Sequence, residues 1–299
     1  MKVLLIDGKN VLYRYGWTFR NLTCGDGRQT GAVYGTLLLL LRLRKAFPDA
    51  RIVVAWDGDE SRTKSWRSRI YPQYKQNRKT TSSNEELFKQ IYAQIPLVKQ
   101  MLTVVGIPHM CVETVEADDL IGILAERCLK RGWEVIVYSR DQDYLQLMTK
   151  GVKIIMQKTE QDGLRFETEA NVRLKFRCSV EDLLKVRAIA GDTSDNIPGV
   201  EHGVGPVRAA KKLADGYKID QHSAAKRNYQ LMCIVDTWSF DLFTETERDL
   251  VRRSVDGTLK SLSTGRGFKV HMGDLLRFFG DLDMEDAIGR RHEILTLHV

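Results

Sequence analysis

Four carboxylates crowd into the nine residues VETVEADDL, which run from Val112 to Leu120. They are Glu113, Glu116, Asp118 and Asp119. One explanation is local, because acids in the first turn of a helix are stabilised by the positive end of the helix dipole. The other is chemical, because oxygen ligands this close together can hold divalent cations. Only further ligands elsewhere in the chain can separate the two.

More acids follow short apolar runs that are typical of buried parallel strands. These runs cover residues 2–6, 51–56, 107–112 and 134–139. The acids after them are, in chain order, Asp7, Asp57, Glu116, Asp118, Asp119, Asp141 and Asp143. Because the carboxyl ends of parallel strands lie at one edge of a sheet, we expect all of these acids to surround one crevice. Helical spacing would let Glu116 and Asp119 share a face.

Carboxylates gathered in this way need cations. Like charges raise one another's pKa, and removing them from water without a countercharge costs several kcal/mol each. A set of oxygen ligands without nearby His or Cys favours Mg²⁺ or Mn²⁺ over Zn²⁺. Two such ions, roughly 3.5–4 Å apart, can activate a water molecule and stabilise both oxygens of a phosphodiester displacement. Two further acids, Asp192 and Asp195, lie in the turn-rich segment GDTSDNIPG, and spacing alone does not place them relative to the crevice.

A basic segment separates the second strand from the acid-rich helix. Residues 62–78 contain six Lys or Arg, no acid, and the aromatic residues Trp66, Tyr71 and Tyr74. Basic side chains neutralise phosphates, and aromatic faces stack on unpaired bases. A solvated basic loop is the alternative. Next to an acidic, metal-filled crevice, this segment indicates metal-assisted hydrolysis of DNA phosphodiesters.

Strand and helix patterns alternate over the first two-thirds of the chain, which predicts an α/β fold with a mostly parallel sheet flanked by helices. A further strand is expected at 152–156, and helices at 31–47, 86–105 and 116–130. After about Ser179 the strand pattern fades. Helical patterns at 180–190, from Pro206 onward and at about 226–235 then surround a turn-rich stretch, and the pattern beyond Gly257 is weak.

The composition favours a cytoplasmic protein with a polyanionic partner. The formal net charge is +7 and the isoelectric point is about 9.1, as for many nucleic-acid-binding proteins. Five scattered cysteines without a CxxC pair indicate a reducing compartment and argue against a zinc site or a disulfide framework. Neither a signal peptide nor a membrane-spanning segment is expected.

An ordered set of motifs runs from Asp7 to Lys212. It comprises Asp7-Gly8 with Arg14, Asp57-Gly58, Trp66-Arg67, Tyr74-Lys75-x-x-Arg78, Glu116-Ala117-Asp118-Asp119, Asp141-x-Asp143, and GDTSDNIPGV followed by Gly203-Val204-Gly205. This set resembles the 5′-nuclease, or flap endonuclease, family. The family includes the nuclease domain of bacterial DNA polymerase I and free-standing phage and bacterial enzymes.

The resemblance implies a PIN-like core in residues 1–178, with a helical arch at about 62–95. A helix–three-turn–helix element and a helical C-terminal part packed on the core would occupy residues 179–299. It also implies two metal clusters. The first consists of Asp7, Asp57, Glu116, Asp118 and Asp119. The second consists of Asp141, Asp143, Asp192 and Asp195, which requires the GDTSDN loop to fold back onto the crevice.

Catalytic and DNA-binding roles follow from the same resemblance. Lys75 and Arg78 would lie near the scissile phosphate, and we count Asp118 with them as catalytic. Tyr74 would steer the displaced nucleotide, and Arg14 and Arg67 would contact phosphates. The segment GVGPVRAAKK would grip the duplex, often with a bound monovalent cation such as K⁺, through Gly203, Gly205, Arg208, Lys211 and Lys212. Glu201-His202 stands where the family usually has one residue, so this turn is expected to be one residue longer.

The leading hypothesis is a structure-specific 5′ nuclease that uses two or more Mg²⁺ ions, with Mn²⁺ as a substitute. Its substrate would be DNA with a 5′ flap or 5′ single-stranded end, with or without an RNA primer, in replication or repair. It would act as a monomer, with a functional link to a DNA polymerase. Two alternatives remain open at this point, namely a DNA-junction binder without catalysis and an RNA-cleaving PIN-type nuclease.

Overall fold

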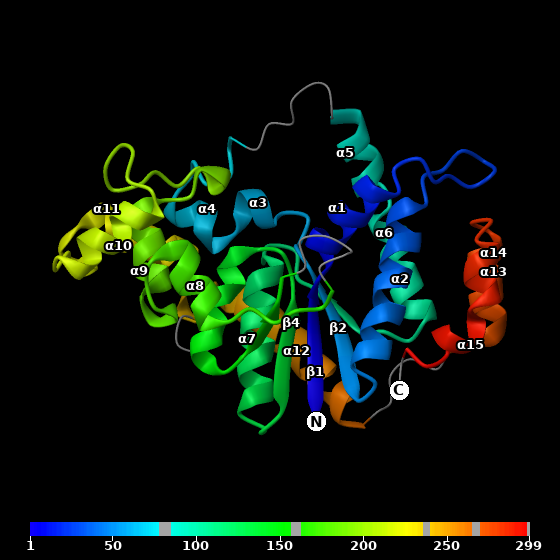
Figure 1. Ribbon diagram of the computed structural model, residues 1–299. Coiled ribbons are helices and arrows are strands. Elements are labelled where there is room, and N and C mark those ends of the chain that lie inside the picture. Colours follow the sequence, from blue (N-terminus) through cyan, green and yellow to red (C-terminus); the bar gives the residue numbers. More distant parts are fainter. Residues whose placement is uncertain (78–84, 157–162, 236–239, 265–269, 298–299) are drawn as a thin grey trace.

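The protein is described by a computed structural model, shown in Figure 1, that covers residues 1–77, 85–156, 163–235, 240–264 and 270–297. A parallel five-stranded sheet lies at its centre, with strands in the order β3-β2-β1-β4-β5. The strands are β1 (Lys2–Asp7), β2 (Ala50–Trp56), β3 (His109–Cys111), β4 (Glu134–Tyr138) and β5 (Lys153–Ile155). The predicted α/β fold and all five expected strands are therefore confirmed, and every strand presents its carboxyl end at the same edge.

Both faces of the sheet are covered, as expected for strands that are apolar throughout. Val3 and Leu5 of β1 belong to one core, and Leu4 and Ile6 belong to the other. Helices α7 (Ala117–Leu129) and α12 (Glu245–Thr264) contribute to the first core. Helices α1 (Gly8–Thr18), α2 (Gly31–Ala46), α6 (Ile95–Val104) and α13 (Met272–Gly280) contribute to the second. These four strand residues are at most 1% exposed, and burying each contributes roughly 1.5–3 kcal/mol.

The segments between β2 and β3 lie above the carboxyl ends of the strands (Figure 1). They form α3 (Ser61–Lys64), α4 (Trp66–Ile70) and α5 (Glu85–Tyr92) before α6 begins. The single helix expected at 86–105 is thus two helices. Pro96 occupies the first turn of α6, where its missing N–H is not needed.

A second group of helices lies beside the sheet (Figure 1). It contains α8 (Glu169–Phe176), α9 (Val180–Ala190), α10 (Pro206–Ala214) and α11 (Ser223–Met232). Val186 and Ile189 of α9 pack on Ala209 of α10 in a small core of their own. The loop between α9 and α10 is therefore anchored at both ends, and it carries the GDTSDNIPG segment.

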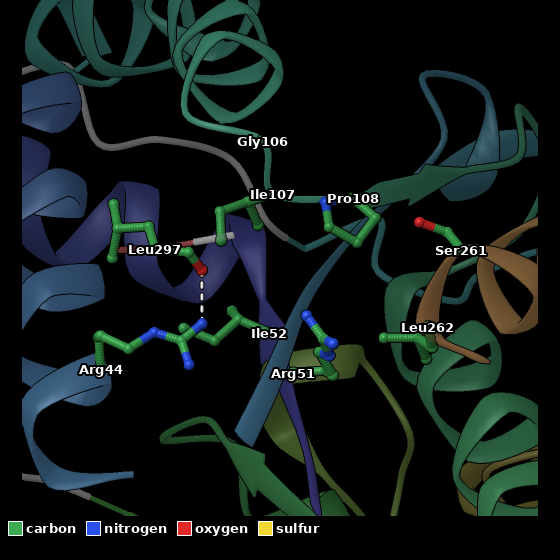
Figure 2. A pocket seen from close by; sticks show the side chains of 9 residues that line it. All are labelled: Arg44, Arg51, Ile52, Gly106, Ile107, Pro108, Ser261, Leu262 and Leu297. Carbon is green, nitrogen blue, oxygen red and sulfur yellow. Dashed lines mark hydrogen bonds between the residues drawn. The ribbon is translucent and has the colours of Figure 1, made fainter. Parts of the chain in front are cut away.

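The C-terminal helices α13, α14 (Glu285–Gly289) and α15 (Arg291–Ile294) pack on the α2 and α6 side of the sheet. Buried Arg44 fixes the end of this region, because its guanidinium donates to the backbone carbonyl of Leu297 (Figure 2). It also donates to the carbonyls of Pro48 and Ala50. The adjoining cavity of about 20 Å³ has room for about one water molecule. No helix in the described ranges has the length and apolar character that a membrane span requires.

Candidate active site

Five carboxylates line one cleft at the carboxyl edge of the sheet, and we call them the cleft acids. They are Asp7 at the end of β1, Asp57 after β2, Glu116 and Asp118 at the start of α7, and Asp141 after β4. The cleft has a volume of about 300 Å³. Its other lining residues are Lys9, Asn10, Tyr13, Lys75, Tyr92 and Tyr144. The expected gathering of acids from successive strand ends is therefore present for these five.

Backbone amides hold three of the cleft acids in place. Asp7 Oδ1 accepts from the N–H of Asn10 at 3.0 Å and caps α1. Asp57 Oδ1 accepts from the N–H of Ala117 at 2.8 Å, at the start of α7. Asp141 Oδ1 accepts from the N–H of Asp143 at 2.9 Å and caps the 3₁₀ helix η1 (Gln142–Lys150). Asp7 and Asp141 thus cap helices while they line the cleft, and Asp57 binds the first N–H of α7, so three helix N-termini point at the cleft.

Two lysines supply positive charge inside the cleft. Lys9 Nζ lies 3.0 Å from Asp57 Oδ2, and Lys75 Nζ lies 2.7 Å from Glu116 Oε2. Lys75 has a left-handed backbone (φ 56°), and its N–H donates to the Asp195 carbonyl at 2.9 Å. Such a conformation is costly for a residue with a Cβ, so the surrounding contacts must fix it. They aim the ammonium group at the cleft acids.

Asp119 lies outside the cleft. It is fully buried, and it accepts hydrogen bonds from Trp66 Nε1 at 2.8 Å, from both terminal nitrogens of Arg67 at 2.8 and 2.9 Å, and from the N–H of Val235 at 2.9 Å. The expectation that it shares a crevice face with Glu116 is corrected by this position. Asp119 is placed to anchor Arg67, and nothing in its geometry supports a role as a metal ligand.

Arg67 is likewise an internal residue. It is 2% exposed, and its terminal nitrogens lie 3.5 Å from Glu116 Oε2 and 3.4 Å from Asp118 Oδ2. The guanidinium therefore links Asp119 to two cleft acids and orients them. This position does not support the expected contact between Arg67 and a phosphate.

The remaining predicted ligands, Asp143, Asp192 and Asp195, do not line the cleft, and we call them the inner acids. Arg187 of α9 pairs with Asp143 and, at 2.9 Å, with Asp192. Asp195 Oδ2 accepts a hydrogen bond from the Tyr74 hydroxyl at 3.1 Å. The inner acids thus lie beside the cleft but already have protein partners.

Tyr74 joins the two groups of acids. Its hydroxyl lies 3.1 Å from Glu116 Oε2 and 3.1 Å from Asp195 Oδ2. The side chain is 4% exposed, so its position does not support the expected stacking on a displaced nucleotide. Asn77 and Lys75 also bond the GDTSDN loop, through the carbonyls of Thr193 and Asp195. These bonds hold the loop against the cleft.

The donor chemistry of the cleft fits a hard divalent cation. All of its charged ligands are carboxylate oxygens, and Glu116 Oε1 is buried with no hydrogen-bond partner in the structure. Such an unpaired buried oxygen costs free energy unless a cation or water meets it. Within the described part of the chain, no three acid, His or Cys side chains already form a metal cage. The cleft acids are the residues that would hold such a cation.

Burial dominates the ionisation of these acids. It raises the pKa of Asp7 to about 6, with help from the neighbouring charge of Asp57. Burial also raises the pKa of Asp118 well above its usual range, although Arg67 opposes this. Burial would raise the pKa of Asp57, but the charges of Lys9 and Lys75 and the hydrogen bond from the N–H of Ala117 together lower it. For Asp143, burial raises the pKa to about 7 against the charge of Arg187. Cations near these groups would make the charged forms favourable.

Residues 2–177 match the family of the 5′-3′ exonuclease, N-terminal resolvase-like domain. The chain belongs to this 5′-3′ exonuclease family. It is 34% identical over 214 residues to a 5′-3′ exonuclease of Aquifex aeolicus, a match that covers 71% of this chain and 69% of the relative. It is also 34% identical over 220 residues to DNA polymerase I of Caldicellulosiruptor bescii, which covers 73% of this chain and 24% of the polymerase. The chain thus spans about a quarter of that polymerase.

Solved structures share the fold. The T5 5′-exonuclease with bound zinc ions has a TM-score of 0.71 at 20% identity, and the match covers 87% of this chain and 99% of that one. Flap endonuclease-1 from Methanococcus jannaschii has a TM-score of 0.58 at 18% identity, covering 99% and 92%. The match to the family and the similarity to the Aquifex aeolicus exonuclease confirm the family resemblance expected from the motifs.

The DNA-binding residues expected from the 5′-3′ exonuclease family fall into three groups. Gly203, Gly205, Arg208 and Lys211 are exposed at and after the turn before α10, with Lys212 partly buried beside Glu201 at 2.8 Å. Arg14 is 9% exposed and donates to the Tyr138 hydroxyl at 2.9 Å, so its position does not support a phosphate contact. Arg78 lies outside the described residues.

Several cleft residues were not predicted from the sequence. Lys9, Asn10 and Tyr13 lie on α1 directly after Asp7, and helical spacing would have placed them at the cleft had residues 8–18 been recognised as a helix. Tyr13 also stacks on Phe88 of α5, with ring centroids 5.3 Å apart. Tyr144 and Arg187 carried no comparable signal, because their importance depends on long-range contacts.

Proposed function

We propose that this chain is a metal-dependent 5′ nuclease that hydrolyses DNA phosphodiesters next to a junction of duplex and 5′ single strand. The observation that carries the proposal is one cleft lined by Lys75 and by five carboxylates that lie at or after the ends of four different strands. Family membership supports the same reaction class. A T5 flap endonuclease of the same fold, 19% identical, was crystallised with DNA and metal ions.

The cleft acids would hold the cations, with Mg²⁺ as the expected ion and Mn²⁺ as a substitute. When bound, such ions supply Lewis-acid stabilisation and lower the pKa of a water nucleophile. Arg67 and Tyr74 orient Glu116, and Arg67 also orients Asp118. Lys75 lines the cleft with its ammonium group 2.7 Å from Glu116 Oε2, and in the DNA complex this group would contact the scissile phosphate. There it would stabilise the charge that develops on the phosphate oxygens.

Helices α9 and α10 with the loop between them would serve as the helix–three-turn–helix element. Gly205 is the N-cap residue of α10, and amides at a helix N-terminus favour phosphate. Gly203 has φ 74°, a left-handed conformation that suits glycine. Arg208, Lys211 and Lys212 would add phosphate contacts, and a K⁺ ion in this loop belongs to the same proposal. The expected arch covers residues 62–95, of which 78–84 lie outside the described residues. Residues 62–77 and 85–95 would form the two sides of the arch.

The substrate would be DNA with a 5′ flap or a free 5′ single-stranded end. The similarity to part of DNA polymerase I motivates a functional link to a polymerase, with the chain itself acting as a monomer. Specificity would come from backbone shape and phosphate contacts.

A cleavage assay tests the proposal. The protein is incubated with a labelled 5′-flap DNA, a fully duplex DNA and an RNA hairpin, each with Mg²⁺ and with EDTA. The proposal predicts Mg²⁺-dependent cutting near the flap junction and little cutting of the RNA. Flap binding without cutting would favour a DNA-junction binder, and preferential RNA cutting would favour a PIN-type ribonuclease.

A further inference from the structure

We infer that the Arg187 guanidinium competes with a divalent ion for the inner acids. The chain would then bind a divalent ion tightly in the cleft and a further ion of the same kind only weakly at the inner acids. This inference rests on the proposed metal-dependent function. It concerns how many ions the resting protein holds and which residue sets that number.

The contacts of Arg187 are those of a bridging counter-ion. Its Nη1 pairs with Asp143 Oδ1, and its Nη2 lies 2.9 Å from Asp192 Oδ2. The side chain is 12% exposed, and the two acids are 17% and 20% exposed. The other oxygen of Asp192 accepts from the N–H of Ser194 at 2.8 Å and from its hydroxyl at 2.6 Å. Asp192 is thus fully partnered without a metal.

Two of the cleft acids, Asp57 and Glu116, are paired with lysines. Lys9 is 37% exposed where it meets Asp57, and Lys75 contacts Glu116 through one nitrogen. An ammonium on a flexible stem is a point charge that can move away. A guanidinium forms a fixed fork, and its charge-assisted bonds are among the stronger ones in proteins. A cation entering among the inner acids must displace the Arg187 guanidinium, which bridges two of them. In the cleft, the Arg67 guanidinium makes its shortest contacts with Asp119, and it lies 3.5 Å from Glu116 and 3.4 Å from Asp118. A cation entering the cleft therefore has to displace only the lysines.

Arg187 lies close to a suitable control residue. Lys185 is two positions away on α9 and pairs with Asp182 at 2.9 Å, but its side chain is 45% exposed and the pair lies outside the acid cluster. Arg187→Gln removes the positive charge and keeps a polar side chain. Arg187→Lys keeps the charge but lacks the forked guanidinium. Lys185→Gln is the control, because it removes a nearby charge that does not contact the inner acids.

The experiment titrates Mn²⁺ into the metal-free full chain without DNA and measures free Mn²⁺ by electron paramagnetic resonance. Wild type and Lys185→Gln should show one tight class of site and weak further binding. Arg187→Gln should strengthen the further site by about 10- to 100-fold, the range expected for losing one or two charge-assisted bonds. Arg187→Lys should give a smaller increase of the same sign. Circular dichroism confirms that each variant is folded.

Unchanged or weaker further binding in the folded variants would overturn the inference. If Arg187 only supports the fold, Arg187→Gln should weaken every Mn²⁺ site and lower the melting temperature. Should Arg187→Gln not fold, the absence of any gain in Arg187→Lys decides against the inference. If the wild-type protein had no tight Mn²⁺ site, the proposed metal-dependent function would be contradicted. The experiment therefore distinguishes a failure of that function from a failure of the inference about Arg187.

Discussion

The cleft acids and the inner acids contain the same kind of side chain, but they differ in what neutralises them. The cleft acids surround a cavity of about 300 Å³, and Lys9 and Lys75 contact two of them. Arg67 lies 3.5 Å from Glu116 and 3.4 Å from Asp118, but its shortest contacts are with Asp119. The inner acids are paired by the Arg187 fork and by Tyr74. Carboxylate type and spacing therefore do not define a metal site by themselves. We propose that the partner cation decides whether a group of acids is available to a metal ion.

The largest expected difference between the two groups is in catalysis. Asp118→Asn in the cleft should lower the cleavage rate at least about 10³-fold, because it removes a charged ligand from the reacting centre. Asp143→Asn among the inner acids should lower it by only about 10- to 100-fold, the range for outer-shell partners. Single-turnover cleavage of a 5′-flap DNA in Mg²⁺ measures both. Equal losses would remove the distinction between the groups.

A variant of Lys75 tests whether this lysine stabilises the transition state or only balances the negative charge of the cleft. Lys75→Ala should slow cleavage by about 10²–10³-fold, the scale of one transition-state donor. Lys9→Ala is the matched control, because it removes the other cleft lysine and should have a smaller effect. The turnover number and KM are measured for each. If Lys75→Ala raised only KM, its proposed contact with the scissile phosphate would be wrong.

The pKa of Asp7 makes stability depend on pH in a defined direction. Its folded pKa of about 6 lies above the ordinary 3.8, so the folded state binds the proton more tightly. Its ionised form therefore destabilises the metal-free protein, fully above about pH 6, and this penalty disappears as pH falls toward 4. Asp7→Asn should accordingly stabilise the metal-free protein by about 1–3 kcal/mol at pH 8 and hardly at all near pH 4.

Urea unfolding in EDTA at several pH values measures this effect. Mg²⁺ should then stabilise wild type at pH 8 and have much less effect on Asp7→Asn, since ligands stabilise only the state that binds them. If the stability gain of Asp7→Asn grew as the pH fell, the pKa of Asp7 would be shifted in the opposite direction. That result would contradict burial as the cause of the shift.

The smallest expected effect lies at α10, away from both groups of acids. Arg208→Ala combined with Lys211→Ala should weaken duplex binding and reduce the salt slope by about 2, one for each lost phosphate contact. Fluorescence anisotropy at several salt concentrations, in Ca²⁺ without cleavage, measures the slope. An unchanged slope would remove α10 from the DNA interface.

The sheet and the cleft could be predicted because they depend on local patterns. Short apolar runs that end in an acid are typical of buried parallel strands, and such strands bring Asp7, Asp57 and Asp141 to one edge. The long helix α12 also carries a readable signal, since its buried Val251, Val255, Leu259 and Leu262 follow helical spacing. It was missed because charged residues dominate that segment.

The partners of the acids could not be predicted in this way. Asp119 and Glu116 are both carboxylates, and their spacing of three residues is compatible with one helix face. Trp66 and the N–H of Val235 nevertheless bind Asp119 alone. These contacts join segments that are 53 and 116 positions apart in the chain. Arg187 is one arginine in an ordinary helical pattern, and only the folded chain places it between Asp143 and Asp192.

The most direct test of this account is a crystal structure of the full chain soaked in Mn²⁺, with anomalous diffraction used to locate the ions. The account predicts a strong anomalous peak between Asp7, Asp57, Glu116, Asp118 and Asp141, and a weaker peak or none at Asp143 and Asp192. A dominant peak among the inner acids, or no peak in the cleft, would contradict it.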